Sequence, residues 1–354
     1  MNKKRLLGIG AIGLLAIAML TGCRANSSGG SSDSNAKAKT ELKVAVVTDT
    51  GGVNDKSFNQ GAWEGLQKWG KSMNLSRGHG INYFQSNSEA DYANNFTSAI
   101  SGDYKLIFGI GYALQTATQN AAKANPKVNF AIIDSTITGD NTASATFADN
   151  EAAYLAGVAA AKTTKTNHVG FIGGQNSDVI TRFRVGFEAG VKSVDSSITI
   201  DSQLADSFVD AGKGKTLAQS MYAAGADVIY QAAGGVGAGV FAQAKALNED
   251  TNEADKVWVV GVDRDQNDEG NYKSKDGKNS NFVLCSTLKG VGAVVEDLSN
   301  KAADDKFPGG QTLTYNLKNS GVDLTTTHLT KDAKTAVETA KQDIIGGTVS
   351  VPEK

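Results

Sequence analysis

Short apolar runs alternate with longer amphipathic segments along the chain from residue 42 onward. The run 42–47 is apolar at most positions, which is typical of a buried strand. Segment 55–73 places apolar side chains at steps of four, four and three from Phe58 to Trp69, which is one face of a helix. The same patterns predict further strands at 81–85, 106–111, 128–134, 169–173, 198–204, 228–233, 257–263 and 282–288. They predict further helices at 91–100, 151–162, 179–194, 217–224, 240–247, 291–303 and 333–345.

Continuous apolar strands separated by helices predict an α/β protein whose parallel sheets are covered by helices on both faces. Ten or so parallel strands would make an unusually large single sheet for a chain of this length, so we expect two sheets in two domains. The Gly/Asn/Thr-rich segment 138–143 is the expected first crossing between them.

The beginning of the chain has the features of an export signal. Three basic residues at positions 3–5 precede the apolar run 6–20, which is too short to span a bilayer. The tetrad Leu20-Thr21-Gly22-Cys23 follows at once and resembles the bacterial lipobox, which implies cleavage before Cys23 and a thioether-linked diacylglyceryl (palmitate-type) lipid on its sulfur. A buried N-terminal helix is the alternative, but soluble domains seldom open with such a segment followed by a polar spacer.

The residues after Cys23 are expected to form a flexible tether. Segment 24–40 contains Ser, Gly, Asn, Ala and Lys without a large apolar side chain, so it cannot bury enough surface to fold. We therefore expect residues 1–22 to be a signal peptide and residues 23–40 a lipidated tether. This places the folded part on the extracellular face of the cell membrane, in a cell without an outer membrane (Gram-positive).

Charge and cysteine content narrow the possible partners. Removal of the signal peptide takes three basic residues away and changes the net charge from −2 to −5. A mildly acidic surface without a basic cluster argues against nucleic acid as a partner. If Cys23 carries lipid, Cys285 has no partner for a disulfide, and its place in an apolar strand favours a role as core filler over a role as nucleophile.

Two patterns in the sequence are similar to nucleotide-binding motifs, but neither is interpreted as one. Segment 237–242 follows a predicted strand, opens a predicted helix and precedes Asp263, which is formally a dinucleotide fingerprint. Nicotinamide cofactors are scarce outside the cell, so these glycines are expected to let the backbone approach another ligand. Segment 212–216 is similar to a Walker A loop, but Val209 stands where that loop requires its first glycine. Lys213 and Lys215 are therefore interpreted as solvated charges early in a helix.

Catalytic and metal-binding constellations are not suggested by the sequence. His79, His168 and His328 are far apart in the chain and lack nearby partners, so we expect no metal site. No Gly-x-Ser-x-Gly elbow occurs. We expect a protein that is not an enzyme and that holds no cofactor.

Polar and aromatic residues instead gather where predicted strands end. Asp49, Asp134 and Asp263 each end a strand, and Phe58 and Phe208 follow strands in the two halves of the chain. Ligands of open α/β sheets bind outside the carboxyl ends of the strands. Carboxylates accept hydrogen bonds from hydroxyl and ring N–H groups, and aromatic rings stack. Each Asp could alternatively cap a helix, but three in equivalent positions favour a binding site.

Seven segments resemble the basic membrane protein family, the PnrA-like nucleoside-binding lipoproteins. They occur in the order expected for the family, and the resemblance covers essentially the whole chain after the signal peptide. The matching segments are 47–60, 151–157, 186–190, 206–208, 225–230, 261–263 and 288–290.

The resemblance implies a type I periplasmic-binding-protein fold, with two Rossmann-like lobes joined by three crossing segments around a central ligand cleft. The expected N-terminal lobe comprises residues 41–143 and 264–312, and the C-terminal lobe comprises residues 144–263 and 313–354. The implied ligand is a purine nucleoside of the guanosine, adenosine and inosine class. Its implied destination is the permease and ATPase subunits of an ABC importer, and we expect the binding protein to be a monomer.

The resemblance also implies roles for single residues. Phe58 and Phe208 would enclose the base, Asp263 would accept hydrogen bonds from the ribose hydroxyls, and Lys289 would lie close by. Asp49 and Asp134 would contact polar edges of the nucleoside, and the backbone at Gly234 would lie against the ligand. Three alternatives stay open: a sugar or polyol ligand on the same fold, a nucleoside hydrolase, and a regulator of the lactose-repressor type.

Overall fold

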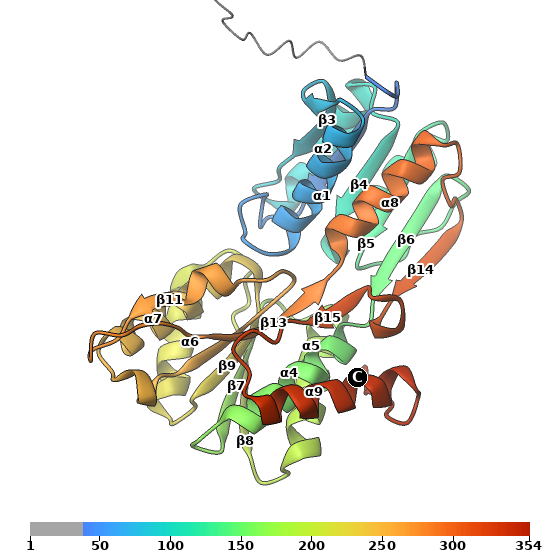
Figure 1. Cartoon of the computed structure of the whole chain (residues 1–354). Coiled ribbons are helices and arrows are strands. Elements are labelled where there is room, and N and C mark those ends of the chain that lie inside the picture. The colour runs from blue at the N-terminus through green and yellow to red at the C-terminus, as the bar shows by residue number, and fades with distance from the viewer. Residues whose placement is uncertain (1–37) are drawn as a thin grey trace, which may run out of the picture. The chain divides into compact units, whose positions relative to one another are not determined.

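The computed structural model describes residues 38–354, which form two lobes, each built on its own sheet (Figure 1). The predicted signal peptide, Cys23 and tether residues 24–37 lie outside the described residues. Within residues 38–354, no helix combines the length and apolarity needed to cross a membrane. The predicted α/β architecture of two sheets with parallel strands is confirmed.

The first lobe is built on a seven-stranded sheet in the order β14-β6-β5-β4-β1-β3-β2, with every neighbouring pair parallel. Next to its central strand β4 lies β1, where five consecutive buried residues alternate between the two faces. The strands are β1 (Val44–Thr48), β2 (Ser76–Arg77), β3 (Gly80–Phe84), β4 (Leu106–Ile110), β5 (Asn129–Ile133), β6 (Thr142–Phe147) and β14 (Gln311–Tyr315).

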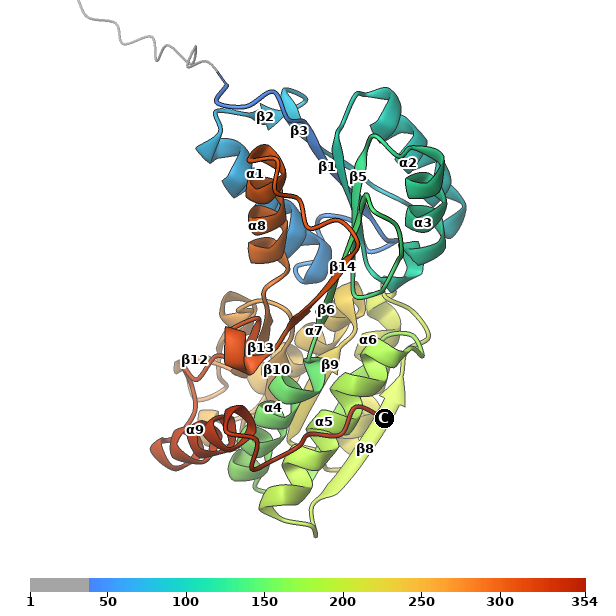
Figure 2. The ribbon, with the colours of Figure 1, turned by 90° about the vertical axis from the view of Figure 1, so that its right-hand side faces the viewer.

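Helices cover both faces of this sheet. Val44 and Val46 of β1 point into a core with Leu66 of α1, and Ala45 and Val47 point into a separate core on the opposite face. Helix α8 packs against α1, and α3 packs against α2 (Figure 2). The helices are α1 (Phe58–Ser72), α2 (Tyr92–Ser101), α3 (Gln115–Ala124) and α8 (Val291–Ala303).

The second lobe is built on a six-stranded sheet in the order β15-β13-β10-β9-β7-β8. Only the edge strand β15 runs antiparallel to its neighbour. The strands are β7 (His168–Gly173), β8 (Thr199–Leu204), β9 (Val228–Ala232), β10 (Trp258–Gly261), β13 (Val283–Lys289) and β15 (Val322–Leu324). The helices are α4 (Asp149–Thr163), α5 (Asp178–Val194), α6 (Ala211–Ala223), α7 (Gly237–Glu249) and α9 (Lys331–Ile345), and a hairpin of β11 (Asn271–Lys273) and β12 (Asn279–Asn281) completes the lobe.

Glycines allow α4 and α5 to pack with their backbones almost in contact. A Cβ atom added at Gly157 would lie 2.2 Å from the carbonyl oxygen of Phe187, and one added at Gly190 would lie 2.0 Å from that of Tyr154. These distances are far below a normal carbon–oxygen contact, so any larger side chain would force the helices apart. The glycines of segments 151–157 and 186–190 therefore serve the packing of these two helices.

The chain passes between the sheets after β6, after β13 and after β14 (Figure 2). The first and third passages are tied together where Ala148 N–H donates to the carbonyl of Tyr315 at 2.8 Å. The Glu151 carboxylate reinforces this link by accepting from Leu317 N–H at 2.8 Å. The second passage joins the third through Gly290 N–H and the Gly321 carbonyl, at 2.9 Å. These bonds make the three passages one connected hinge.

The lobe boundaries differ from the sequence-based expectation at all three crossings, the third by three residues only because β14 continues to Tyr315. Residues 264–289 were expected in the first lobe, but β11 contacts α7 and β13 pairs with β10, so the chain stays in the second lobe until Lys289. Segment 138–143 was expected to be the first crossing, yet it leads into β6, and the crossing follows Phe147. On this topology we propose lobes of residues 38–147 with 290–315, and 148–289 with 316–354.

Candidate ligand-binding cleft

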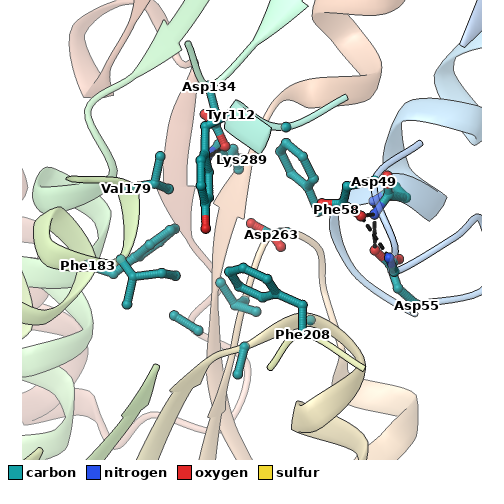
Figure 3. Close-up of a pocket in the computed structure, with 18 residues that line it drawn as sticks. Asp49, Asp55, Phe58, Tyr112, Asp134, Val179, Phe183, Phe208, Asp263 and Lys289 are labelled. Carbon is teal, nitrogen blue, oxygen red and sulfur yellow. Dashed lines mark hydrogen bonds and ion pairs between the residues drawn. The ribbon is translucent and has the colours of Figure 1, made fainter. Parts of the chain in front are cut away.

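A cavity lies between the lobes at the carboxyl ends of the strands, with about 570 Å³ of empty space when its open mouth is included. All seven residues expected from the sequence line it: Asp49, Phe58, Asp134, Phe208, Gly234, Asp263 and Lys289 (Figure 3). Residues separated by up to 240 positions are thereby brought into one site.

Asp49 follows β1 and is held by groups of its own lobe. Its Oδ1 atom accepts from Gly51 N–H at 2.9 Å and from the Asn59 side-chain amide at 2.8 Å. Within residues 38–354 its Oδ2 atom makes no hydrogen bond and lies beside Gly111. Burial raises the pKa of Asp49 to about 6, with Asp55 and Asp134 adding to the rise and the bonds from Gly51 and Asn59 opposing it.

Asp263 follows β10 in the second lobe and bonds across the cleft. Its Oδ2 atom accepts a hydrogen bond from the hydroxyl of Ser57, which precedes α1 in the first lobe. Burial raises the pKa of Asp263 to about 7, although Lys289 and the Ser57 hydroxyl oppose the rise. Its Oδ1 atom has no hydrogen-bond partner in the described part of the chain.

Asp134 and Asp263 occupy corresponding places in the two lobes, and both have left-handed backbone, with φ of 65° and 66°. Asp is among the few non-glycine residues that adopt this conformation readily. Such residues concentrate at functional sites, where the surrounding structure holds a conformation that is otherwise little populated. The matched backbone aims both carboxylates from the strand ends toward the cavity.

Lys289 ends β13 and joins two carboxylates. Its Nζ atom lies 2.6 Å from Oδ2 of Asp134 and 2.9 Å from Oδ1 of Asp149. Burial lowers the pKa of Lys289, but Asp134, Asp149 and Asp263 offset this and raise it above its ordinary value. Three phenyl rings surround the ammonium group, with centroids 5.2 Å away for Phe58, 5.0 Å for Phe147 and 5.5 Å for Phe183. The other oxygen of Asp134, Oδ1, is buried without a hydrogen-bond partner.

Phe58 and Phe208 line the cavity from different lobes, and in the view of Figure 3 their rings flank Asp263. Phe208 is held by its backbone, because its carbonyl accepts from Gly235 N–H at 2.9 Å. Its ring covers Gly174, where an added Cβ would lie 2.1 Å from ring carbon Cε1. The ring also meets Tyr112 of the first lobe edge-on, with centroids 6.4 Å apart.

Sequence reasoning missed several members of the site. Tyr112 lies two residues after the end of β4, so the rule that identified the aspartates could have found it. Val179, Ile180 and Phe183 line the cavity from the first turns of α5, but their spacing predicts only an apolar helix face. Asp149 pairs with Lys289, which is 140 positions away, and no local pattern could have indicated this contact.

The glycine-rich segments differ from the expectation in one respect. Gly237 and Gly239 were expected to let the backbone approach a ligand, but neither lines the cavity. A Cβ on Gly239 would lie 1.8 Å from the Ala211 carbonyl oxygen, so this glycine serves the packing of α7 on α6.

Two further expectations concern residues outside the cleft. Lys213 and Lys215 are exposed in the first turns of α6, as predicted. Cys285 is buried in the core as predicted, and burial raises the pKa of its thiol far above the ordinary value.

Comparison with known proteins identifies relatives over nearly the whole chain. Residues 42–354 match the family model described as ABC transporter substrate-binding protein PnrA-like. The chain is 61% identical over 353 residues to the ABC transporter nucleoside-binding protein BmpA of Lactococcus lactis subsp. cremoris, covering 99% of this chain and 100% of that protein. It is 48% identical over 357 residues to the CD4+ T-cell-stimulating antigen of Listeria monocytogenes, covering 99% of each.

Solved structures share the fold. An ABC transporter solute-binding protein from Aeropyrum pernix K1 superimposes with a TM-score of 0.76 at 23% sequence identity, covering 88% of this chain and 94% of that one. The periplasmic-binding-protein architecture of two Rossmann-like lobes, implied by the sequence resemblance, is thereby confirmed.

Proposed function

Because the chain belongs to the family of PnrA-like ABC transporter substrate-binding proteins, we propose that it captures purine nucleosides in the cleft between its lobes and delivers them to an importer. The observation that carries this proposal is the arrangement of three carboxylates around the cavity. Asp49, Asp134 and Asp263 each commit one oxygen to a protein partner and leave the other without one. Such a site suits a ligand with several N–H and O–H donors, as a nucleoside has.

The aromatic residues supply the second component of nucleoside recognition. Phe58 belongs to the first lobe and Phe208 to the second, so a planar base between them would contact both lobes at once. Stacking of a base on an aromatic side chain contributes roughly 1–3 kcal/mol. Carboxylate acceptors add charge-assisted hydrogen bonds, which are about twice as strong as neutral ones. Asp263, with Lys289 beside it, is the proposed contact for the ribose hydroxyls.

The same contacts suggest how capture proceeds. Ser57 meets Asp263, and Lys289 meets Asp134, so both bonds join one lobe to the other beside the cavity. Bending at the hinge would separate these groups and open the cleft, and a ligand that touches both lobes would favour closure. This is capture without chemistry, and we propose that the protein is a receptor and not an enzyme.

Further proposals concern the surroundings of the protein. A lipid on Cys23 would hold the receptor beside its permease and ATPase subunits, which raises its effective concentration there. We propose the extracellular face of the cell membrane as its location, and a monomer as its working form.

A thermal-shift panel tests the proposed ligand. Guanosine, adenosine and inosine are each added at 100 times their dissociation constant, where a single-site ligand stabilises by ~2.7 kcal/mol. D-Ribose and galactose serve as sugar controls, and free base released from the nucleosides is measured in the same samples. Stabilisation by nucleosides without release of base is expected. Stabilisation by sugars alone would favour a sugar or polyol receptor, and accumulation of free base would favour a hydrolase.

A further inference from the structure

Two charged residues stand behind the cavity without lining it. Asp149 lies in the first turn of α4, and its side chain is fully buried. Arg182 lies on α5, with 19% of its side chain exposed, and its Nη2 atom is 3.1 Å from Oδ2 of Asp149. The other oxygen of Asp149 is the one that lies 2.9 Å from Lys289. Asp149 therefore connects the lysine of the cleft to an arginine outside it.

Together the four groups form an alternating chain of charges: Asp134, Lys289, Asp149 and Arg182. Successive members are 2.6, 2.9 and 3.1 Å apart. Two carboxylates and two cations make the set electrically neutral, although a buried lysine in a ligand cleft would by itself attract anions. The neutrality depends on two residues that never touch the cavity.

We propose that Asp149 and Arg182 are specificity-determining positioning residues that hold Lys289 in a neutral cluster, so that the cleft accepts neutral nucleosides and rejects their phosphate esters. This inference rests on the proposed function. The two carboxylates take up the charge of the ammonium group, and the phenyl rings of Phe58, Phe147 and Phe183 limit the space into which it could turn. Among the residues of the described chain that line the cleft, Lys289 is the one cation, so a phosphate entering the cleft would meet Asp49 and Asp263 with that charge already paired.

Changing the two residues moves the charge of the cluster in opposite directions. Asp149→Asn keeps the shape of the side chain but leaves the cluster with one excess positive charge. Arg182→Gln leaves it with one excess negative charge. A unit charge acts strongly on a ligand anion several ångströms away in a partly buried site. Each substitution is therefore expected to alter the preference for nucleoside over nucleotide by roughly tenfold.

The experiment measures the ratio of dissociation constants for guanosine 5′-monophosphate and guanosine with the full-length protein in detergent at low ionic strength. The wild-type ratio is expected to fall roughly tenfold in Asp149→Asn and to rise roughly tenfold in Arg182→Gln. Arg184→Gln is the matched control, because it removes the same charge from the same helix, where Arg184 pairs with Glu188 at 3.2 Å. Its ratio is expected to stay at the wild-type value.

If Asp149 and Arg182 had a purely structural role, their substitution would weaken the binding of both ligands together and leave the ratios unchanged. That result would overturn the inference. Equal changes in Arg182→Gln and Arg184→Gln would also overturn it, because the effect would then come from net charge alone. If Asp149→Asn does not fold, the comparison of the two arginine variants decides. Absence of guanosine binding to the wild type would instead overturn the proposed function, and this inference with it.

Discussion

The Nζ atom of Lys289 lies 2.6 Å from Oδ2 of Asp134, and this buried ion pair joins the second lobe to the first inside the cleft. Only 3% and 5% of the two side chains are exposed, so opening of the lobes must bring both charges into contact with water. Separating a buried pair exchanges a strong interaction in a medium of low dielectric constant for hydration of each ion. The ion pair between Lys289 and Asp134 is thus a link between the lobes that the proposed opening of the hinge would break.

Phe208→Ala is expected to weaken guanosine binding by ~1–3 kcal/mol, because water replaces one aromatic wall of the cleft. Phe208 is half-buried in a loop after β8, so the melting temperature of the ligand-free protein should change little. Isothermal titration calorimetry measures the affinity. Val209→Ala is the matched control, since Val209 is the next residue and is 55% exposed outside the cavity. Unchanged affinity in Phe208→Ala would assign the stacking role to another residue.

Asp263→Asn is expected to weaken the binding of nucleosides more than the binding of free bases, because Asp263 is the proposed partner of the ribose hydroxyls. The substitution keeps the shape of the side chain but removes the charge that strengthens its hydrogen bonds. Competition titrations with guanosine and guanine give the two affinities. An equal loss for nucleoside and base would contradict the ribose assignment.

Guanosine affinity is expected to rise from pH 5 to pH 7 and to level off by pH 8. Burial raises the pKa of Asp49 to about 6 and that of Asp263 to about 7 in the ligand-free cleft. At pH 5 both carboxyls are mostly protonated, whereas a donor-rich ligand binds their ionised forms, so binding must release protons. The affinity should therefore increase tenfold or more over this interval. Titrations in buffers of different ionisation enthalpy count the protons, and proton uptake, or tightest binding at pH 5, would refute this linkage.

The same pKa values predict the pH dependence of stability without ligand. A carboxyl whose pKa is raised on folding stabilises the folded state below its unfolded pKa, and this contribution is lost as the pH rises through the folded value. Asp263→Asn should therefore raise the melting temperature of the ligand-free protein at pH 8 and change it little at pH 5. Thermal unfolding of both proteins at the two pH values checks this. A larger gain at pH 5 would contradict the assigned direction.

Gly190→Ala is expected to destabilise the protein by ~1–3 kcal/mol, since its Cβ would lie 2.0 Å from the carbonyl oxygen of Tyr154. Gly61→Ala makes the same change inside α1, where nothing lies within 4 Å of the new Cβ, and should stabilise by ~0.5–1 kcal/mol. Urea unfolding compares the two variants. Equal effects would show that the close packing of α4 on α5 does not set the cost.

Much of the fold could be predicted because most central strands are continuously apolar. β1 and β4 each contain five consecutive buried residues. A strand is buried on both sides when helices cover both faces of its sheet, so a continuous apolar run predicts this architecture. The exceptions have weak local signals. Helix α3 has the sequence QTATQNAAKA, in which only Thr118 and Ala122 are buried, and β6 has TASATF, whose small side chains are buried by neighbouring strands. Tertiary packing determines these elements.

The candidate site was predictable to the extent that it follows from strand ends. Asp49, Asp134 and Asp263 are located by the rule that ligands bind outside the carboxyl ends of parallel strands. The pairing of Lys289 with Asp134 and Asp149 depends on where the hinge segments lie in space, and sequence spacing holds no information about it. The sequence resemblance indicated Lys289 as a site residue, but the carboxylates that neutralise it became visible only in the folded structure.

The most direct test is calorimetric titration of the full-length wild-type protein with guanosine at pH 7.5, followed by the same titration with D-ribose. We expect guanosine to bind saturably at one site per chain and ribose to give no heat of binding. Binding of ribose with no response to guanosine, adenosine or inosine would contradict the account of the cleft as a purine nucleoside receptor.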